Sequence, residues 1–176
     1  MQLEITRPPR TILEVYRMLP EGTRAEVING TLFMSPAPLL NHQRIIVELT
    51  SAINDFVKKN NLGELFVSPV DVYLNQKNAF QPDIVFVSKR KSKILKEDGI
   101  YGAPDLVIEV LSPGTSKSDL TKKKAVYEKE GVAEYWAVDP QTKLAIGFRL
   151  RKGKYEIFKE EKRKLDSVLL NHVFKF

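Results

Sequence analysis

The 176-residue sequence contains no cysteine and only two histidines, His42 and His172. The lack of cysteine excludes disulfides, zinc–thiolate sites and cysteine nucleophiles, and two histidines disfavour a histidine-built zinc site. No segment approaches the ~18 consecutive apolar residues that a membrane-spanning helix needs, and Met1-Gln2-Leu3-Glu4 lacks the basic start of a secretion signal. We therefore expect a cytoplasmic protein that does not contact a membrane.

The composition, 43% hydrophobic and 28% charged, is typical of one folded domain, and we expect residues 1–176 to form a single domain. Lysine and arginine number 28 against 22 acidic residues, which gives a net charge of +6. This balance falls in the range of nucleic-acid-binding proteins, although lysine-rich surfaces also serve solubility. The basic residues gather in three clusters: Lys89, Arg90, Lys91, Lys93 and Lys96; Lys117 with Lys122, Lys123 and Lys124; and Lys162, Arg163 and Lys164.

Hydrophobic spacing predicts a mixed α/β fold, in which a mixed sheet is flanked by helices and carries β additions at both ends of the chain. Asn29-Gly30 is a strong signal for an early hairpin. Ser68-Pro69 interrupts one strand, which is therefore bent or at an edge there. The expected helices span 11–19, 42–59 and 118–130, and the expected strands span 25–28, 31–34, 64–74, 80–87, 105–111, 134–138, 144–150 and 154–158.

Two segments combine a Pro-Asp pair with an aliphatic run, and the second contains Glu109 where aliphatic residues are expected. An ionised carboxylate in a buried strand is unfavourable unless a metal ion or a lysine compensates its charge. Asp105 and Glu109 share a face but lie roughly 13 Å apart along the strand, too far for one ion. Paired strands are only about 4.8 Å apart, so Asp83 is the better partner for Glu109. Asp105 is then a strand-entry residue at the rim of the sheet.

The helix expected after the second Pro-Asp strand places one lysine toward the sheet. At about 100° per residue, Lys123 lies on the buried arc, whereas Lys122 faces solvent. Beside a metal ion, an ammonium there would stabilise the negative charge that develops during phosphodiester hydrolysis. The alternative is that the stem of Lys123 packs while its charged end reaches water.

Together these motifs resemble the PD-(D/E)XK nuclease superfamily, and more closely its bacterial branch of restriction endonucleases of unknown biological role. The resemblance covers about residues 26–139. It departs from the superfamily pattern at Leu111, where lysine is expected; in this branch the lysine is thought to lie on the following helix, and Lys123 fits that position. The residues that carry the resemblance are Glu26, Gly30, Ser35-Pro36, His42, Gln81-Pro82-Asp83, Pro104-Asp105, Glu109-Val110, Ser112-Pro113, Asp119, Lys123, Tyr127 and the run from Gly131 to Asp139.

The resemblance implies a restriction-endonuclease-like fold and a metal-dependent endonuclease that uses Mg²⁺ or Mn²⁺. Asp83 and Glu109 would bind the ion, and Lys123 would complete the catalytic set. Glu26 would add a carboxylate or be a solvated hairpin residue, and His42 would touch substrate or be structural. The substrate would be nucleic acid, DNA more readily than RNA, and a homodimer would suit the cutting of two strands.

We expect nucleic-acid contacts from the basic clusters beside the carboxylate strands, at Lys89, Arg90, Lys91, Lys117 and Lys122. Two other functions remain open. The chain could be an inactive nuclease fold that binds DNA or serves a structural dimer role. A glycoside hydrolase would need two carboxylates about 5–9.5 Å apart in a sugar cleft, and the lysine-rich loops argue against it.

Overall fold

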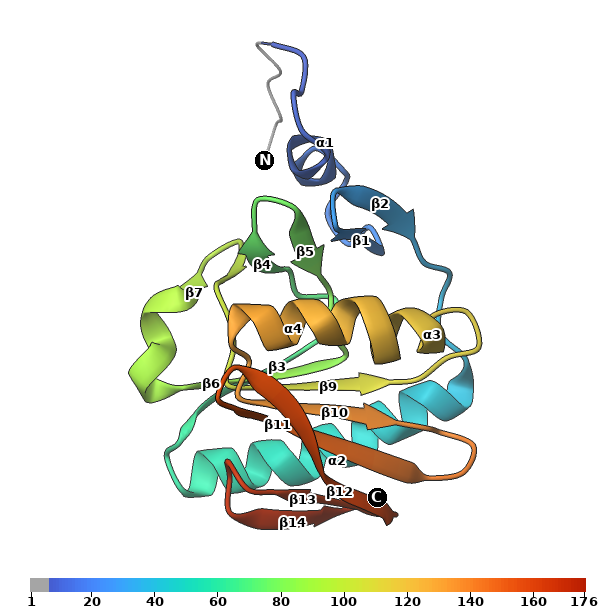
Figure 1. Ribbon diagram of the computed structural model, residues 1–176, viewed down its shortest axis with the longest axis vertical. Helices are drawn as coiled ribbons and strands as arrows, with labels where there is room; N and C mark the ends of the chain where they lie inside the picture. Colours follow the sequence, from blue (N-terminus) through green and yellow to red (C-terminus); the bar gives the residue numbers. More distant parts are fainter. Residues whose placement is uncertain (1–6) are drawn as a thin grey trace.

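The computed structural model describes residues 7–176, so the segment Met1–Glu4, used above to exclude a secretion signal, lies outside it. Residues 7–176 form two six-stranded sheets and a two-stranded hairpin, with helices packed between and around them (Figure 1). The mixed α/β arrangement expected from the sequence is thereby confirmed. Within the described residues, no helix has both the length and the apolar composition needed to cross a membrane.

The two sheets differ in the length of their strands, and the sheet with the longer strands is called the larger sheet. The main hydrophobic core surrounds this larger sheet. Its strands lie in the order β12 (Lys154–Lys162), β11 (Leu144–Arg151), β10 (Glu134–Val138), β9 (Leu106–Val110), β6 (Ile84–Ser88) and β3 (Gly63–Val67). Only β9 and β10 pair in parallel; the other pairs are antiparallel. The central strands are almost continuously apolar because both faces of this sheet are covered.

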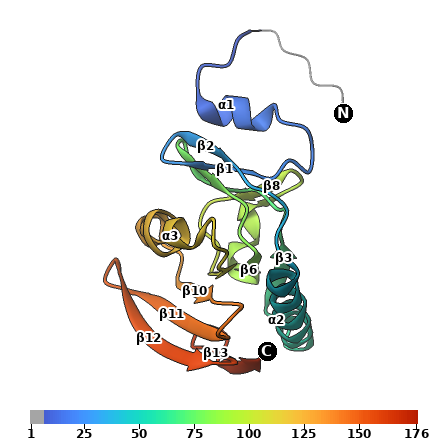
Figure 2. The same cartoon turned by 90° about the vertical axis from the view of Figure 1, so that its right-hand side faces the viewer.

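Two helical layers cover the faces of this sheet (Figure 2). The helix α2 (Leu40–Lys59) packs on one face. Its Ile45, Leu49 and Ile53 contact Ile108 and the other strand residues whose side chains point to that face. On the other face lies a helical segment built from α3 (Ser116–Ser118), a π-helical turn η2 (Asp119–Lys123) and α4 (Lys124–Glu130). Alternate residues of each strand therefore enter different cores, as the strand period of two requires.

In the view of Figure 1 the smaller sheet lies above the larger sheet and its two helical layers. It contacts α1 (Ile12–Arg17). Its strands lie in the order β2 (Thr31–Met34), β1 (Ala25–Ile28), β5 (Asn78–Phe80), β4 (Val72–Asn75), β8 (Gly99–Tyr101) and β7 (Leu95–Lys96). A 3-10 helix, η1 (Lys89–Ile94), links β6 to this sheet. The hairpin expected at Asn29-Gly30 is present, and Gly30 has the positive φ of +77° that such a turn requires.

Two expected strands are wrong as single elements. In 80–87, Phe80 ends β5 of the smaller sheet and Ile84 begins β6 of the larger sheet. In 64–74, the chain also passes from one sheet to the other. The chain divides at Ser68-Pro69, so that β3 joins the larger sheet and β4 the smaller one. Proline has no N–H to donate to a strand ladder, and the chain changes sheet at that residue. The hairpin of β13 (Lys164–Ser167) and β14 (His172–Lys175) was not predicted; Leu165 and Phe174 fix it to the main hydrophobic core.

The other helix boundaries follow the expected pattern with small differences. The helix expected over 42–59 begins two residues earlier, at Leu40, and ends at Lys59 as expected. Gly63 is the first residue of β3. The helix expected over 118–130 begins at Ser116 and ends where predicted, because Gly131 adopts the left-handed conformation (φ +89°) favoured at helix C-termini.

Candidate active site

Two carboxylates meet at one end of the larger sheet. Strands β6 and β9 are antiparallel with Ile84 opposite Ile108, which sets Asp83 beside Glu109. The Asp83 Oδ2 atom accepts a hydrogen bond of 2.8 Å from the backbone N–H of Val110. The two side chains are buried, with 6% of Asp83 and 4% of Glu109 exposed. The strand pairing predicted from residue spacing is therefore confirmed.

The Lys123 ammonium lies at the centre of the cluster. Its Nζ atom is 2.6 Å from Glu109 Oε1 and 3.4 Å from Asp119 Oδ1. Lys123 is only 3% exposed, whereas Lys122 is exposed, so the predicted facing of both residues is confirmed. Lys123 does not reach water, and the alternative of a solvated ammonium is wrong. Lys123 ends a π-helical turn, a local distortion that occurs frequently at functional sites.

Glu26 enters the same cluster from β1 of the smaller sheet. Its Oε1 atom is 2.8 Å from Lys123 Nζ and accepts a hydrogen bond of 2.9 Å from the backbone N–H of Gln81. The alternative that Glu26 is a solvated hairpin residue is therefore wrong. Lys123 thereby connects Glu26 of the smaller sheet to Glu109 of the larger sheet.

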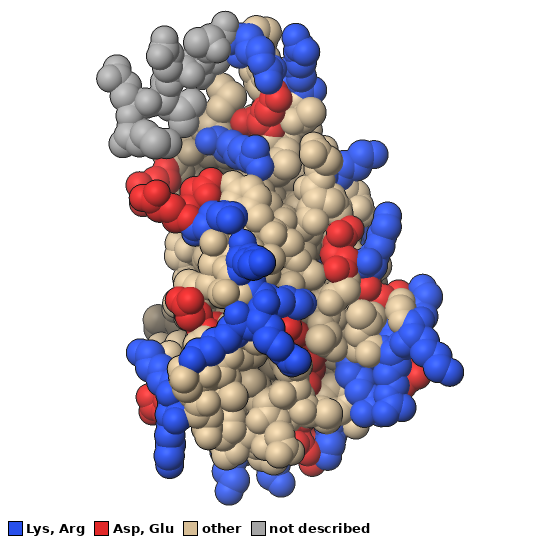
Figure 3. Space-filling view, turned by 90° about the vertical axis from the view of Figure 1, so that its left-hand side faces the viewer, with Lys and Arg blue, Asp and Glu red and all other residues tan. Residues whose placement is uncertain are grey.

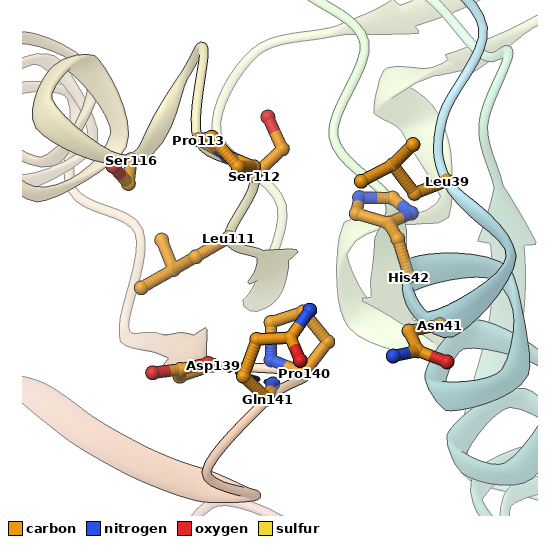
Figure 4. A pocket seen from close by; sticks show the side chains of 10 residues that line it. All are labelled: Leu39, Asn41, His42, Leu111, Ser112, Pro113, Ser116, Asp139, Pro140 and Gln141. Atoms are coloured by element: carbon orange, nitrogen blue, oxygen red, sulfur yellow. Dashed lines mark hydrogen bonds between the residues drawn. The ribbon is translucent and has the colours of Figure 1, made fainter.

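His42 approaches Asp83 from the first turn of α2. Its Nε2 atom lies 3.1 Å from Asp83 Oδ2, while its Nδ1 atom is buried and has no hydrogen-bond partner within the described residues. The ring lines a pocket of about 200 Å³ beside the carboxylates. In Figure 4 side chains from the start of α2, from the segment after β9 and from the β10–β11 turn surround this pocket.

Two further residues belong to the cluster and were not predicted as site residues. The Tyr127 hydroxyl donates a hydrogen bond of 2.8 Å to Glu109 Oε1, and the buried Asp119 contacts Lys123. Residues 119, 123 and 127 are spaced four apart, which places them on one helix face. That spacing was the sequence signal that could have identified both.

The predicted nucleic-acid-binding residues do not lie together. Lys117 and Lys122 are exposed on the helical segment that contains Lys123. Lys89 and Arg90 are exposed on η1, which follows the opposite end of β6 from Asp83 (Figure 1). The face that carries η1 is rich in basic side chains (Figure 3).

Lys91, the third basic residue predicted on η1, contributes to local structure. Its Nζ atom donates to the Ala103 carbonyl at 3.0 Å and lies 3.5 Å from Asp105 Oδ1. The Asp105 carboxylate also accepts the backbone N–H of Ser88 at 2.7 Å. The expected role of Asp105 as a strand-entry residue is thus confirmed.

The cluster contains four carboxyl groups, those of Asp83, Glu109, Asp119 and Glu26, and one ammonium, that of Lys123. Burial raises the pKa of the Glu109 carboxyl well above its ordinary range, against the opposing effect of Lys123. Burial alone would lower the pKa of Lys123, but Glu109, Glu26 and Asp119 outweigh it and raise that pKa well above its ordinary value. One ammonium therefore faces several carboxylates, and such an arrangement attracts a cation.

The donor atoms fit a magnesium-like ion. Carboxylate oxygens are the ligands of Mg²⁺ and Mn²⁺, and Mg²⁺ commonly binds through only one or two carboxylates while it keeps several waters. Asp83 and Glu109 would supply those two carboxylates. Among residues 7–176, no three His, Asp or Glu side chains are arranged so that they could hold a metal ion, and the Lys123 ammonium bridges Glu26 and Glu109 instead.

The raised pKa of Glu109 predicts how Glu109→Gln responds to pH. A carboxyl whose pKa is higher in the folded than in the unfolded state contributes stability below its unfolded pKa and loses that contribution as pH rises through the folded pKa. Glutamine lacks this titration. In metal-free buffer, the melting temperature of Glu109→Gln should therefore rise relative to the unsubstituted protein as the pH rises above about 4.5, the ordinary pKa of a glutamate. A relative fall would mean that the fold lowers the pKa of Glu109.

Comparison with known proteins adds independent information. Residues 12–174 match a family described as "Uma2: Putative restriction endonuclease". A solved structure from Anabaena variabilis, described as "a putative nuclease belonging to DUF820", shares the fold with a TM-score of 0.75. It is 24% identical, and the match covers 93% of this chain and 92% of that chain. No curated protein matches the sequence.

These matches agree with the resemblance found in the sequence. The structural match shows a nuclease-like fold, and the family match extends over nearly the whole chain, beyond the motifs between Glu26 and Asp139. The superfamily resemblance is thereby confirmed. The chain belongs to the Uma2 family, whose description reads "Putative restriction endonuclease".

Proposed function

We propose that this protein is a Mg²⁺- or Mn²⁺-dependent endonuclease that hydrolyses phosphodiester bonds of nucleic acid, DNA in preference to RNA. One observation carries the proposal: the buried Lys123 ammonium contacts Glu109 and Glu26 at the strand end where Asp83 also lies. Membership of the Uma2 family supports a nuclease-like function. The proposal includes a homodimer, since two sites suit the cutting of both strands of a duplex.

Asp83 and Glu109 would hold the ion. When bound there, such an ion polarises a phosphoryl oxygen and lowers the pKa of a coordinated water. The positive charge of Lys123 would stabilise the negative charge that develops on the phosphate. Its other contacts, to Glu26 and Asp119, fix the ammonium at this position.

The side chains of Tyr127 and His42 would position the two carboxylates. The Tyr127 hydroxyl holds Glu109 Oε1 at 2.8 Å, and His42 Nε2 lies 3.1 Å from Asp83 Oδ2. Hydrogen bonds of this kind fix the orientation of metal-binding carboxylates. The His42 ring also lines the adjacent pocket, which would place it beside a bound substrate.

A second function is favoured by a specific observation. Lys123 bridges two carboxylates and partly neutralises them, and no group of three metal-binding side chains is assembled in residues 7–176. A nuclease fold that binds nucleic acid without cutting it would have the same features. Activity measurements separate the two functions.

The test is a cleavage assay on plasmid DNA, single-stranded DNA and RNA with Mg²⁺, with Mn²⁺ and with EDTA. The proposal predicts cleavage of DNA with either ion, none with EDTA, and none by Asp83→Ala with any of these additions. Binding without cleavage under all conditions would support the inactive module. Equal cleavage by Asp83→Ala would reveal a contaminating nuclease or a different site.

A further inference from the structure

A basic depression lies between α2 and the C-terminal hairpin. The space is open and has a volume of about 830 Å³. It is lined by Lys162, Arg163, Lys164, Lys175 and Phe176, and by Glu48, Ser51 and Ala52 of α2. The four basic side chains are exposed. They come from the end of β12, the corner that follows it and the end of β14, so segments distant in sequence bring their charges together.

The four charges of this basic depression are not neutralised by ion pairs. Neighbouring carboxylates are bound elsewhere: Glu48 lies 3.7 Å from Lys143 Nζ, and Asp166 lies 2.6 Å from Lys159 Nζ. Within the described part of the chain, none of the four basic residues has a carboxylate within 4.0 Å. A concave surface with uncompensated positive charge attracts polyanions.

The basic depression lies at the same end of the larger sheet as the candidate active site. Cross-strand pairing places Val110, Val138, Ala145 and Glu161 in one row, so Lys162 lies three strands from the residue after Glu109. Three strand spacings amount to about 14 Å. The row gives the spacing along the sheet only: the depression lies on the face covered by α2, and Lys123 lies on the opposite face. The two faces meet at this end of the sheet, where His42 of α2 reaches Asp83.

The β10–β11 turn connects the pocket beside His42 to the basic depression. Gln141 of this turn lines the pocket beside His42, and Lys143 follows two residues later. The Lys143 carbonyl accepts the backbone N–H of Arg163 at 2.8 Å. Asp139 also lines the pocket. Burial raises the pKa of Asp139, but the backbone N–H groups of Gln141 and Thr142 donate to its carboxylate and lower that pKa overall. These bonds direct the carboxylate toward its own turn.

We infer that the basic depression binds the sugar–phosphate backbone of the nucleic acid beside the phosphate to be cut. The inference rests on the proposed function and names the surface through which that site holds its substrate. It adds a surface to the sequence prediction, which placed contacts on Lys117 and Lys122 and on Lys89, Arg90 and Lys91. The last three residues follow the far end of β6, whereas the depression and the carboxylates share one end.

The test compares two variants that each lose four positive charges. The first carries Lys162→Gln, Arg163→Gln, Lys164→Gln and Lys175→Gln. The matched control carries Lys58→Gln, Lys59→Gln, Arg151→Gln and Lys152→Gln, at exposed positions near the C-terminal end of α2 and in the β11–β12 turn. Fluorescence anisotropy with a labelled 30-base-pair duplex in EDTA, between 50 and 200 mM KCl, gives the affinity and its salt dependence.

We expect the depression variant to bind about tenfold or more weakly at 50 mM KCl and its log–log salt slope to shrink by about 3 to 4, which corresponds to four lost phosphate contacts. The control should keep the slope of the unsubstituted protein. Equal losses in both variants would assign the effect to net charge and overturn the inference. A larger loss in Lys89→Gln/Arg90→Gln/Lys93→Gln would overturn it in favour of η1.

The outcomes also separate this inference from the proposed function. If the unsubstituted protein binds DNA and the depression variant binds equally well, the inference fails while the proposed function stands. If the unsubstituted protein binds neither duplex nor single-stranded DNA, both fail. Unchanged melting temperatures show that the substitutions, all at exposed positions, have not altered the fold.

Discussion

Lys123→Met should lower kcat for cleavage by a factor of roughly 10² or more, whereas Lys122→Met should leave kcat unchanged at saturating substrate. Both variants lose one positive charge, so the general attraction for nucleic acid falls equally. Only Lys123 lies within 2.8 Å of the carboxylates at the site. The difference between the variants therefore reports on the chemical step. Comparable kcat values would contradict the assignment of Lys123 as the catalytic lysine.

Lys123→Met also affects stability, which has to be measured beside activity. Removal of the ammonium leaves buried carboxylates without a counter-charge, a change that typically costs about 3–5 kcal/mol. Protonation of Glu109, whose pKa is already raised by burial, would reduce that loss. If the variant unfolds, Lys123→Met combined with Asp119→Asn removes one carboxylate together with the ammonium, and the same comparison of kcat applies.

The neighbourhood of Asp83 and Glu109 could be predicted because it depends on short-range rules. The period of two along a strand and the spacing of about 4.8 Å between strands select Asp83 over Asp105 as the partner of Glu109. The facing of Lys123 followed from the helical repeat, although a π-helical turn replaces part of the α-helix.

Other features depend on contacts between distant segments and could not be predicted. Nothing local shows that β3 and β4 belong to different sheets, or that Glu26 crosses from the smaller sheet to Lys123. The β13–β14 hairpin likewise forms because Leu165 and Phe174 reach a core built mostly by earlier residues.

The placement of the basic clusters could have been predicted more accurately from strand direction. Asp83 precedes β6, and Lys89 follows it, so the length of the strand separates them. Glu109 is near the C-terminal end of β9, and Lys117 follows that same end of the strand. Closeness in sequence to a strand is therefore uninformative unless the end of the strand is also considered.

The central claim is that Asp83 and Glu109 form a divalent-ion site, and calorimetric titration with Mn²⁺ tests it most directly. The unsubstituted protein should bind Mn²⁺, and Asp83→Asn and Glu109→Gln should each abolish binding while the protein stays folded, because loss of one carboxylate relieves repulsion among the others. Asp105→Asn is the matched control: it changes a buried carboxylate that serves Ser88 and Lys91, and it should leave Mn²⁺ affinity unchanged. Absence of Mn²⁺ binding by the unsubstituted protein, or unchanged affinity in Asp83→Asn and Glu109→Gln, would contradict the claim.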